Sequence, residues 1–288
     1  MQNIINGKFC DASNKATMNI VNPYTNRVID TVPNSTEKDA KKAIEYAKKA
    51  QKSWKNLPIH QKVKILYRFM ELVDQNTDDL AKTLCKETGK PITQAYGEIA
   101  NVRISFEAFC EKAKHLYGNV IPAGTEAGQE KTLQITVREP LGVMVAIIPF
   151  NFPCDLFDQK VAPAILAGNT VIVKPPHQNP LTLIKLVKLL HEAGLPNGVV
   201  QILTGEGAIV GNALARNEDV HGITFTGSTA VGKITYKNGA EHLAHVALEL
   251  GGNDAFIVLE DADLDLAVKE IVWGRMYNTG QVCCASKR

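Results

Sequence analysis

The feature that most constrains this sequence is an alternation of short apolar runs and amphipathic segments in its second half. Residues 143–148 form one unbroken apolar run, and similar runs lie at residues 170–173, 199–203, 222–225 and 246–250. Unbroken apolar runs are typical of strands that are buried on both faces, and the segments between them have helical spacing. Strands that alternate with helices form βαβ units. We therefore predict an α/β fold with an open, mostly parallel Rossmann-like sheet and helices on both faces.

The first part of the chain predicts short strands followed by helices. Turn residues recur to about Pro33, and Thr36–Asp39 has the pattern of a capping box that begins a helix. Helical spacing then covers residues 61–75, a segment that stops at Gly89, and a segment from about 93 to 116. The charges along these helices alternate in sign, and the simplest interpretation is that the charged residues lie on a solvent-exposed face of each helix. We expect an N-terminal helical segment that precedes the sheet.

Charge and cysteine content exclude several function classes. The 32 basic and 30 acidic residues give a net charge of +2, which offers no argument for a nucleic-acid or membrane-surface partner. No apolar run is long enough to span a membrane, and the first residues do not resemble a signal peptide. The six cysteines are scattered apart from Cys283 and Cys284, so neither a metal site nor a disulfide framework is expected. We expect a cytoplasmic protein.

Two glycine-rich turns follow predicted strands. The first contains Gly207, but its spacing departs from the dinucleotide-binding fingerprint, and a helix-packing turn is an equal alternative. The second contains Gly227, Ser228 and Gly232. In this turn the absence of a side chain at Gly227 admits a ligand, Ser228 can cap the helix, and the free N–H groups suit a pyrophosphate. The alternative is an ordinary N-capped helix.

Four polar or reactive side chains stand out at strand ends and in loops. Lys174 ends a strand where it can bind a ribose hydroxyl or a phosphate, with a solvated lysine as the alternative. Cys283 lies in a small polar loop, where a cysteine is more often reactive than structural. Glu249 interrupts an apolar strand, so we expect it to face the core or a cleft. It is then either a paired structural carboxylate or a desolvated general base. Asn151 lies just after a strand and has a proline on either side of it. It can be an oxyanion donor, and the alternative is an asparagine that forms a turn.

Together these segments resemble the aldehyde dehydrogenase family. The matching motifs occur in order along nearly the whole chain, at Asn22-Pro23, Glu87–Pro91, Pro149–Pro153, Ala162–Asn169, Val173–Pro175, Phe225–Gly232, Leu248–Asn253 and Gly280–Cys283. The resemblance implies oxidation of a small-molecule aldehyde to a carboxylic acid, with NADP or NAD as cofactor. A classical alcohol-type dehydrogenase is excluded, because the ribose-binding carboxylate and zinc ligands are missing.

The resemblance also implies a role for individual residues. Cys283 is the nucleophile, Asn151 holds the oxyanion, Glu249 activates the water, and Lys160 supports Glu249 through a proton path. The residues implied in cofactor binding are Ile148, Pro149, Lys174, Gly207, Gly227, Ser228, Gly232 and Leu250.

The resemblance divides the chain into four parts. Residues 1–121 are strands and helices of the cofactor domain, 122–140 an oligomerisation arm with an exposed strand near 131–139, 141–251 the Rossmann-like cofactor-binding domain, and 252–288 the start of a truncated catalytic domain. A homo-oligomer is expected for the complete protein. The chain is then an incomplete enzyme, and the alternatives are a non-catalytic nucleotide-binding remnant or one half of a split enzyme.

Three positions bear on specificity. His177 stands where many NAD-preferring relatives carry a ribose-binding glutamate, so the carboxylate that repels the 2′-phosphate of NADP is missing. Asp155 and Gln159 replace apolar positions of the aldehyde funnel, and an unpaired buried polar group costs about 1–3 kcal/mol. We therefore expect NADP to be accepted and a short, polar aldehyde to be the substrate.

Overall fold

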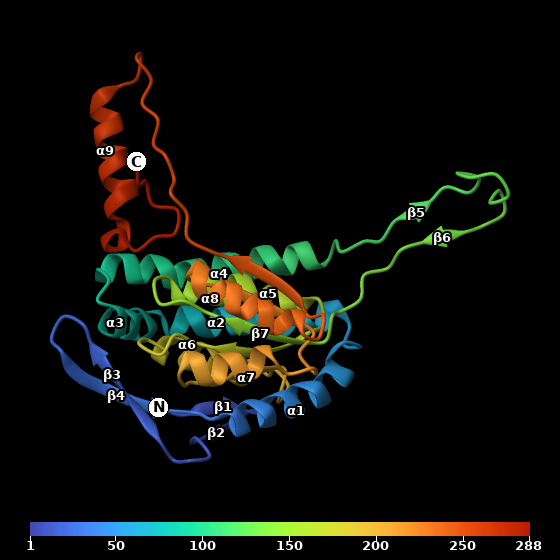
Figure 1. Cartoon of the computed structure of the whole chain (residues 1–288), viewed down its shortest axis with the longest axis horizontal. Helices are drawn as coiled ribbons and strands as arrows, with labels where there is room; N and C mark the ends of the chain where they lie inside the picture. The colour runs from blue at the N-terminus through green and yellow to red at the C-terminus, as the bar shows by residue number, and fades with distance from the viewer.

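A seven-stranded sheet forms the centre of the structure (Figure 1). The computed structural model describes residues 1–288. The five parallel strands are β7 (Val143–Ile147), β8 (Thr170–Lys174), β9 (Val200–Ile202), β10 (Gly222–Thr226) and β11 (His245–Glu249). Their order is β11-β10-β7-β8-β9. Each of them coincides with a predicted apolar run to within one or two residues, which confirms the mostly parallel sheet.

The sheet is completed by a strand pair from the start of the chain. Strand β1 (Asn3–Ile5) lies antiparallel to β9, with Ile4 opposite Ile202, and β2 (Lys8–Cys10) pairs with β1 at the edge. Asn6 and Gly7 form the tight turn between them with φ values of 51° and 70°, as a two-residue hairpin turn requires. The sequence predicts short strands here but not their place in the main sheet.

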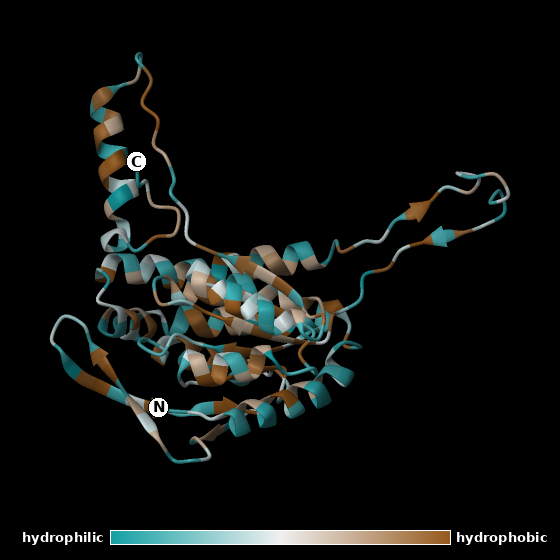
Figure 2. Ribbon diagram, viewed as in Figure 1, coloured by the Kyte–Doolittle hydropathy of each residue, from teal (hydrophilic) through white to brown (hydrophobic).

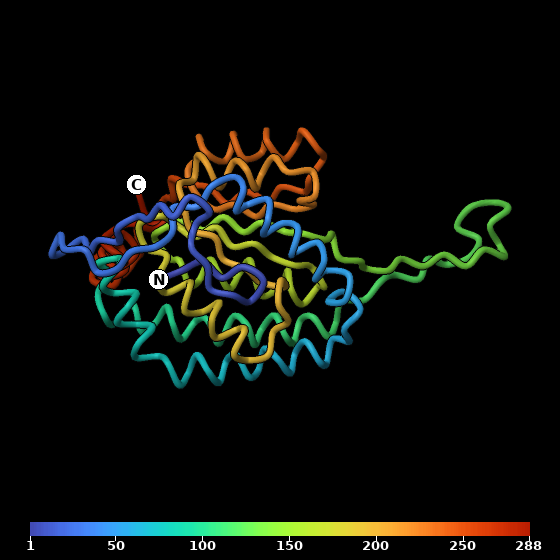
Figure 3. The backbone as a smooth tube through the Cα atoms, turned by 90° about the horizontal axis from the view of Figure 1, so that it is seen from below, coloured from blue at the N-terminus to red at the C-terminus, as the bar shows by residue number.

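Helices cover both faces of the sheet (Figures 1 and 3). One face carries α2 (Ile59–Gln75), α3 (Thr77–Thr88), α4 (Ile92–Ala113), α5 (Pro153–Leu166) and α6 (Leu181–Glu192). The other carries α1 (Glu37–Trp54), the short helix η1 (Gly207–Gly211), α7 (Asn212–Ala215) and α8 (Thr229–Ala240). Alternate strand residues enter the two cores: Val171 and Val173 of β8 face the first, and Ile172 faces the second.

The predicted start of α1 and the predicted end of α3 are both found in the structure. Thr36 and Asp39 form the capping box of α1, with the Thr36 N–H donating to Asp39 Oδ2 over 2.9 Å. Gly89 ends α3 in the left-handed conformation, with φ of 74°. The solvated-face interpretation of the helix charges is wrong for Glu87 at the end of α3 and for Glu98 of α4, which are both buried; Lys90, in the turn between these helices, is buried as well.

Three segments extend from this body. The hairpin β3 (Thr17–Asn22) and β4 (Arg27–Pro33) packs beside α3. The arm of β5 (Val120–Ile121) and β6 (Gln134–Ile135) projects away from the body (Figure 1). Apolar residues of the arm are exposed, and the ribbon of β5 has the colour of hydrophobic residues in Figure 2. Of the predicted strand at 131–139, only Gln134 and Ile135 pair, with Ile121 and Val120.

The last segment contains α9 (Leu264–Met276) and a short 3-10 turn, η2 (Tyr277–Gly280). Helix α9 extends from the body of the fold (Figure 1) and has no buried residue, although Leu264, Val268 and Trp273 are large and apolar. A membrane span is not found among the helices, since none is both long and apolar enough.

Candidate active site

The carboxyl ends of the parallel strands border an open cleft of about 690 Å³. Parallel strands all end at the same edge of a sheet, so the loops that follow them converge there. The predicted site residues that line the cleft are Ile148, Pro149, Asn151, Lys174, Gly227, Ser228, Leu250 and Cys283. Gly207, Gly232, Lys160 and Glu249 do not line it.

The turn after β10 supplies backbone N–H groups to this cleft. Ser228 caps α8, and its Oγ accepts a hydrogen bond from the Val231 N–H over 3.4 Å. The absence of a side chain matters at two of its glycines. A Cβ atom on Gly227 would lie 2.6 Å from the Phe225 ring, and one on Gly232 would lie 2.7 Å from a Leu250 methyl group. Gly232 therefore serves the packing of α8 on the end of β11, whereas Gly227 and Ser228 face the cleft.

Lys174 is a buried lysine without a partner. It is 4% exposed, its ammonium makes no hydrogen bond, and burial lowers the pKa of Lys174 to about 8. His177 lies near it in the cleft, and the pKa of His177 is lowered by burial first and by the Lys174 charge second. The interpretation of Lys174 as a solvated strand-end residue is therefore wrong. An uncompensated buried cation at a cleft wall favours an anionic ligand.

Lys160 of α5 and Glu249 at the end of β11 do not line the cleft. The Lys160 ammonium donates to Thr224 Oγ1 of β10 over 3.1 Å, and burial lowers the pKa of Lys160 to about 8, while the Glu249 charge opposes that change. The expected burial of Glu249 is wrong, because β11 is the edge strand of the sheet. Helix α8 covers one face of β11, and the alternate face, which carries Glu249, is exposed.

The loop that carries Cys283 is bonded to the turn that carries Asn151. Asn151 Nδ2 donates to the Gln281 carbonyl over 3.0 Å, and Asn278 Nδ2 donates to the Asn151 carbonyl over 2.9 Å. Residues 278, 279 and 280 all have positive φ, at 48°, 56° and 76°, which turns the chain sharply ahead of the cysteine. The Cys283 thiol is exposed and lies on the cleft. A side-chain amide has two N–H donors, so Asn151 keeps one beyond its bond to Gln281.

An exposed cysteine, an amide donor beside it and a cation at the cofactor edge of the same cleft match the chemistry expected of the sequence motifs. The aldehyde dehydrogenase family model matches residues 9–288. The chain belongs to this family. It is 41% identical to a glutarate-semialdehyde dehydrogenase of Pseudomonas putida over 287 residues, which is 100% of this chain and 59% of that protein. It is 38% identical to a succinate-semialdehyde dehydrogenase [NADP(+)] of Escherichia coli, with the same coverage.

Solved structures agree with this assignment. An NADP-dependent enzyme of E. coli superposes with a TM-score of 0.96 at 37% identity, covering 100% of this chain and 59% of that one. A 3,6-anhydro-L-galactose dehydrogenase in complex with NAP superposes with a TM-score of 0.94 at 36% identity, covering 99% and 59%. This aldehyde dehydrogenase chain therefore spans about 59% of the length of the relatives that it matches.

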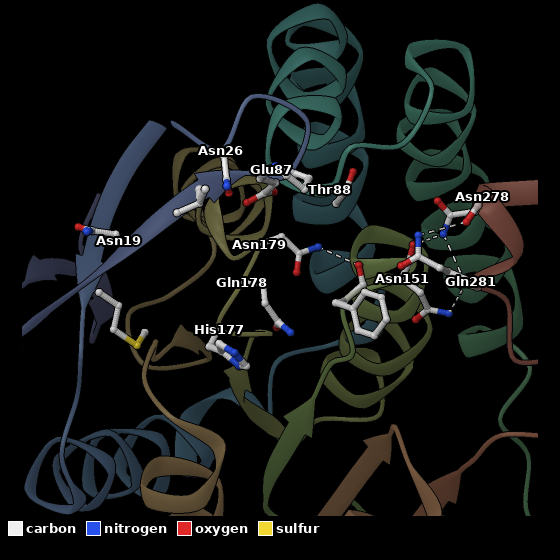
Figure 4. A pocket seen from close by; sticks show the side chains of 14 residues that line it. Asn19, Asn26, Glu87, Thr88, Asn151, His177, Gln178, Asn179, Asn278 and Gln281 are labelled. Atoms are coloured by element: carbon white, nitrogen blue, oxygen red, sulfur yellow. Dashed lines mark hydrogen bonds between the residues drawn. The ribbon is translucent and has the colours of Figure 1, made fainter. Parts of the chain in front are cut away.

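A second cavity lies behind the Asn151 turn of this aldehyde dehydrogenase chain. It has a volume of about 470 Å³ and is bordered by the β3–β4 hairpin, the end of α3 and both loops of the cleft. Figure 4 shows Asn151, Asn278 and Gln281 joined by hydrogen bonds at one side of it, away from Asn19 and Asn26. The Asn151 turn thus borders both the cleft and the second cavity. Its position therefore depends on the buried residues that bond to it.

Sequence reasoning missed three residues that hold this turn: Lys90, Glu98 and Asn278. Lys90 lies in a matching family motif and Asn278 in the loop before Cys283, but neither motif indicates a contact with the Asn151 turn. Glu98 reaches this turn because α4 packs against α5. No group of three or more His, Cys, Asp or Glu side chains is placed to hold a metal ion.

Proposed function

We propose that the protein containing this chain oxidises an aldehyde to a carboxylic acid, with NADP or NAD as hydride acceptor. The observation that carries the proposal is the meeting of Cys283, Asn151 and Lys174 in one cleft. The cofactor side of that cleft fits a dinucleotide, because Lys174 is buried without an anionic partner and the first turn of α8 presents free N–H groups. When bound, the nicotinamide accepts the hydride.

The residues of this chain perform the remaining steps. The Cys283 thiolate attacks the aldehyde carbon, and the carbonyl oxygen takes the electron pair of the broken π bond. The Asn151 amide and the Cys283 N–H donate to that oxyanion. Loss of hydride leaves a thioester on Cys283. Glu249 removes a proton from water, the hydroxide adds to the thioester, and the acid departs as the thiol is restored. The family resemblance implies that Lys160 supports Glu249 through a proton path; in this structure the Lys160 ammonium bonds to Thr224 Oγ1, and the Glu249 charge acts on it without a direct bond.

Cofactor preference follows from the residues near Lys174. His177 replaces a carboxylate, so nothing at that position repels the 2′-phosphate, and Lys174 attracts it. We propose that NADP is used at least as well as NAD. The relatives named for NADP support this choice, among them the E. coli enzyme and a D-glyceraldehyde dehydrogenase of Picrophilus torridus.

The substrate we propose is a short, polar aldehyde. Asp155 Oδ1 is buried without a hydrogen-bond partner, and burial raises the pKa of Asp155 to about 7. Asp155 lines neither the cleft nor the second cavity, so this proposal rests on the place in the aldehyde funnel that the family resemblance implies for it. In that place a substrate hydroxyl would donate to the unpaired oxygen, which a long alkyl chain could not do. Gln159, one turn further along α5, is exposed. Several relatives are named for polar aldehydes, including the two semialdehyde dehydrogenases.

The remaining parts of the proposal concern assembly and location. We propose that residues 1–121 and 141–251 form the cofactor domain, that 252–288 begins the catalytic domain, and that the arm at 122–140 joins subunits of a homo-oligomer. Exposed apolar residues within this segment, such as Leu133 and Ile135, support that role. A cytoplasmic location is proposed because Cys283 acts only as a free thiol. A nucleotide-binding remnant or a split-enzyme half remains the alternative for the chain alone.

A test uses the complete protein and two neighbouring cysteines. Reduced cofactor is followed by absorbance with a panel of aldehydes, in the absence of coenzyme A. Cys283→Ala should abolish turnover, whereas Cys284→Ala, the matched control, should retain most of it. Oxidation that survives Cys283→Ala, or that requires coenzyme A, would contradict the proposed hydrolytic mechanism.

A further inference from the structure

Lys90 and Glu98 form an ion pair that is buried inside the protein. Each side chain is 1% exposed, and Lys90 Nζ bonds directly to Glu98 Oε2. Lys90 follows Gly89, which ends α3 in the left-handed conformation. The chain reverses there, and the Lys90 side chain meets Glu98 in the second turn of α4. A buried ion pair is costly to desolvate, so it persists only where further hydrogen bonds use its remaining atoms.

Those remaining atoms all contact the segment around Asn151. Lys90 Nζ donates to the Asn151 carbonyl over 3.1 Å and lies 4.2 Å from the centre of the Phe152 ring. Glu98 Oε1 accepts the Cys154 N–H over 2.8 Å, at the start of α5. The pair therefore fixes the backbone immediately before and after the turn, and leaves the Asn151 side chain free to bond elsewhere.

The same helix also reaches the Cys283 loop. Gln94 Oε1 of α4 accepts the Asn278 N–H over 3.0 Å, and the Phe152 and Tyr277 rings stack with centroids 6.0 Å apart. Asn278 Nδ2 and Lys90 Nζ both donate to one oxygen, the Asn151 carbonyl. A carbonyl oxygen has two lone pairs, so these two donors saturate it. The orientation of the Asn151 peptide is then determined by one donor from each side.

We propose that Lys90 and Glu98 are positioning residues that set the Asn151 amide relative to Cys283. Without the Lys90 donor, the Asn151 carbonyl keeps only its bond from Asn278 in the Cys283 loop, although Asn179 still donates to the preceding Phe150 carbonyl over 2.8 Å. The Asn151 peptide can then follow the movements of the Cys283 loop. A misplacement of about 1 Å at a reacting centre can cost on the order of a hundredfold in rate. The inference rests on the proposed function, in which the Asn151 amide donates a hydrogen bond to the oxyanion.

The decisive variant is Lys90→Met/Glu98→Gln in the complete protein. It removes both charges together, so no lone buried charge remains, and the amide oxygen introduced by Glu98→Gln can still accept the Cys154 N–H. The donation to the Asn151 carbonyl is lost. We expect kcat to fall about ten- to a hundredfold, with KM for the cofactor and the melting temperature nearly unchanged. Lys185→Met, which breaks the ion pair with Asp79 on the far side of α3, is the control and should leave kcat unchanged.

A double-mutant cycle with Asn151→Ala separates positioning from support of the fold. If the pair acts through the Asn151 amide, the Lys90/Glu98 change should have little further effect once that amide is gone. An unchanged kcat in the Lys90→Met/Glu98→Gln variant, or full additivity with Asn151→Ala, overturns the proposal.

Hydrogen–deuterium exchange of this 288-residue chain tests the same inference without catalysis. The Lys90→Met/Glu98→Gln variant should exchange faster in residues 150–156 and also in 276–284, with α6 unaffected. Faster exchange in the first segment alone would show that the pair does not act on the Cys283 loop. A wild-type protein that oxidises no aldehyde refutes the proposed function, and the exchange result then still decides whether the pair couples the two loops.

Discussion

Replacing Lys174 with methionine should stabilise this chain at neutral pH. The lysine is 4% exposed, has no partner, and has a pKa lowered from 10.5 to about 8 by burial. Each pKa unit corresponds to about 1.36 kcal/mol, so burial of the ammonium disfavours the folded state by roughly 3 kcal/mol as an upper limit. Methionine is unbranched and apolar, and it can fill the same space without that cost.

The sign of the pH dependence follows from the lowered pKa. Below about pH 8, Lys174 is protonated in both the folded and the unfolded state, so the full cost is present. Between pH 8 and 10.5 the unfolded state binds the extra proton, and the wild-type protein becomes more stable relative to the variant. We expect Lys174→Met to be about 1–3 kcal/mol more stable at about pH 6.5 and to lose this advantage as the pH approaches 10.5.

Urea unfolding of the two proteins at about pH 6.5, 8 and 9.5 measures this difference. Lys188→Met, which changes an exposed lysine of α6, is the control and should give a difference that does not vary with pH. If Lys174→Met is no more stable than wild type at the lowest pH, or if its advantage persists undiminished at high pH, then Lys174 is not an unpaired buried cation and our account of the cofactor edge is wrong.

The other predictions concern cofactor binding, catalysis and stability. Calorimetric titration should show NADP binding to weaken as the pH rises through about 8, more than NAD binding does, because Lys174 loses its charge there. In the complete protein, Glu249→Gln should slow thioester breakdown by on the order of a hundredfold, as quenched-flow measurement of the acyl-enzyme would detect; unchanged turnover would remove Glu249 from the mechanism. Burial raises the pKa of Asp158 to about 9, so Asp158→Asn should raise the melting temperature at about pH 7, with the gain shrinking towards pH 4 as the unfolded carboxylate protonates. This chain alone should show little aldehyde oxidation, since α9 lacks buried contacts; robust turnover by the purified chain would contradict that view.

The sequence predicts those parts of the fold that depend on neighbours along the chain. The apolar run at 170–173, the capping box at Thr36 and the helix at 181–192 are all found in the structure, because periodicity and capping act within a few residues. The family motifs likewise place Asn151 and Cys283, and the structure brings both to one cleft.

Contacts between distant segments are what the sequence could not supply. The charge of Glu98 matches the pattern of a solvated helix face, but α4 packs against α5 and Glu98 is buried with Lys90. Glu249 shows the opposite error. Its apolar neighbours predict burial, but β11 lies at the sheet edge, and position in the sheet is a property of the topology and not of the strand.

The antiparallel junction between β1 and β9 has a consequence for how the chain folds. Ile4 pairs with Ile202, and Asn3 fastens the junction by accepting hydrogen bonds from the Thr204 N–H and hydroxyl. Such pairings between segments far apart in sequence slow folding, because a long loop must close before any contact compensates for its entropy. During synthesis β1 emerges well before its partner strand β9, which begins only at Val200. Ile4 and Ile5, which are buried in the finished fold, therefore remain exposed until β9 has emerged.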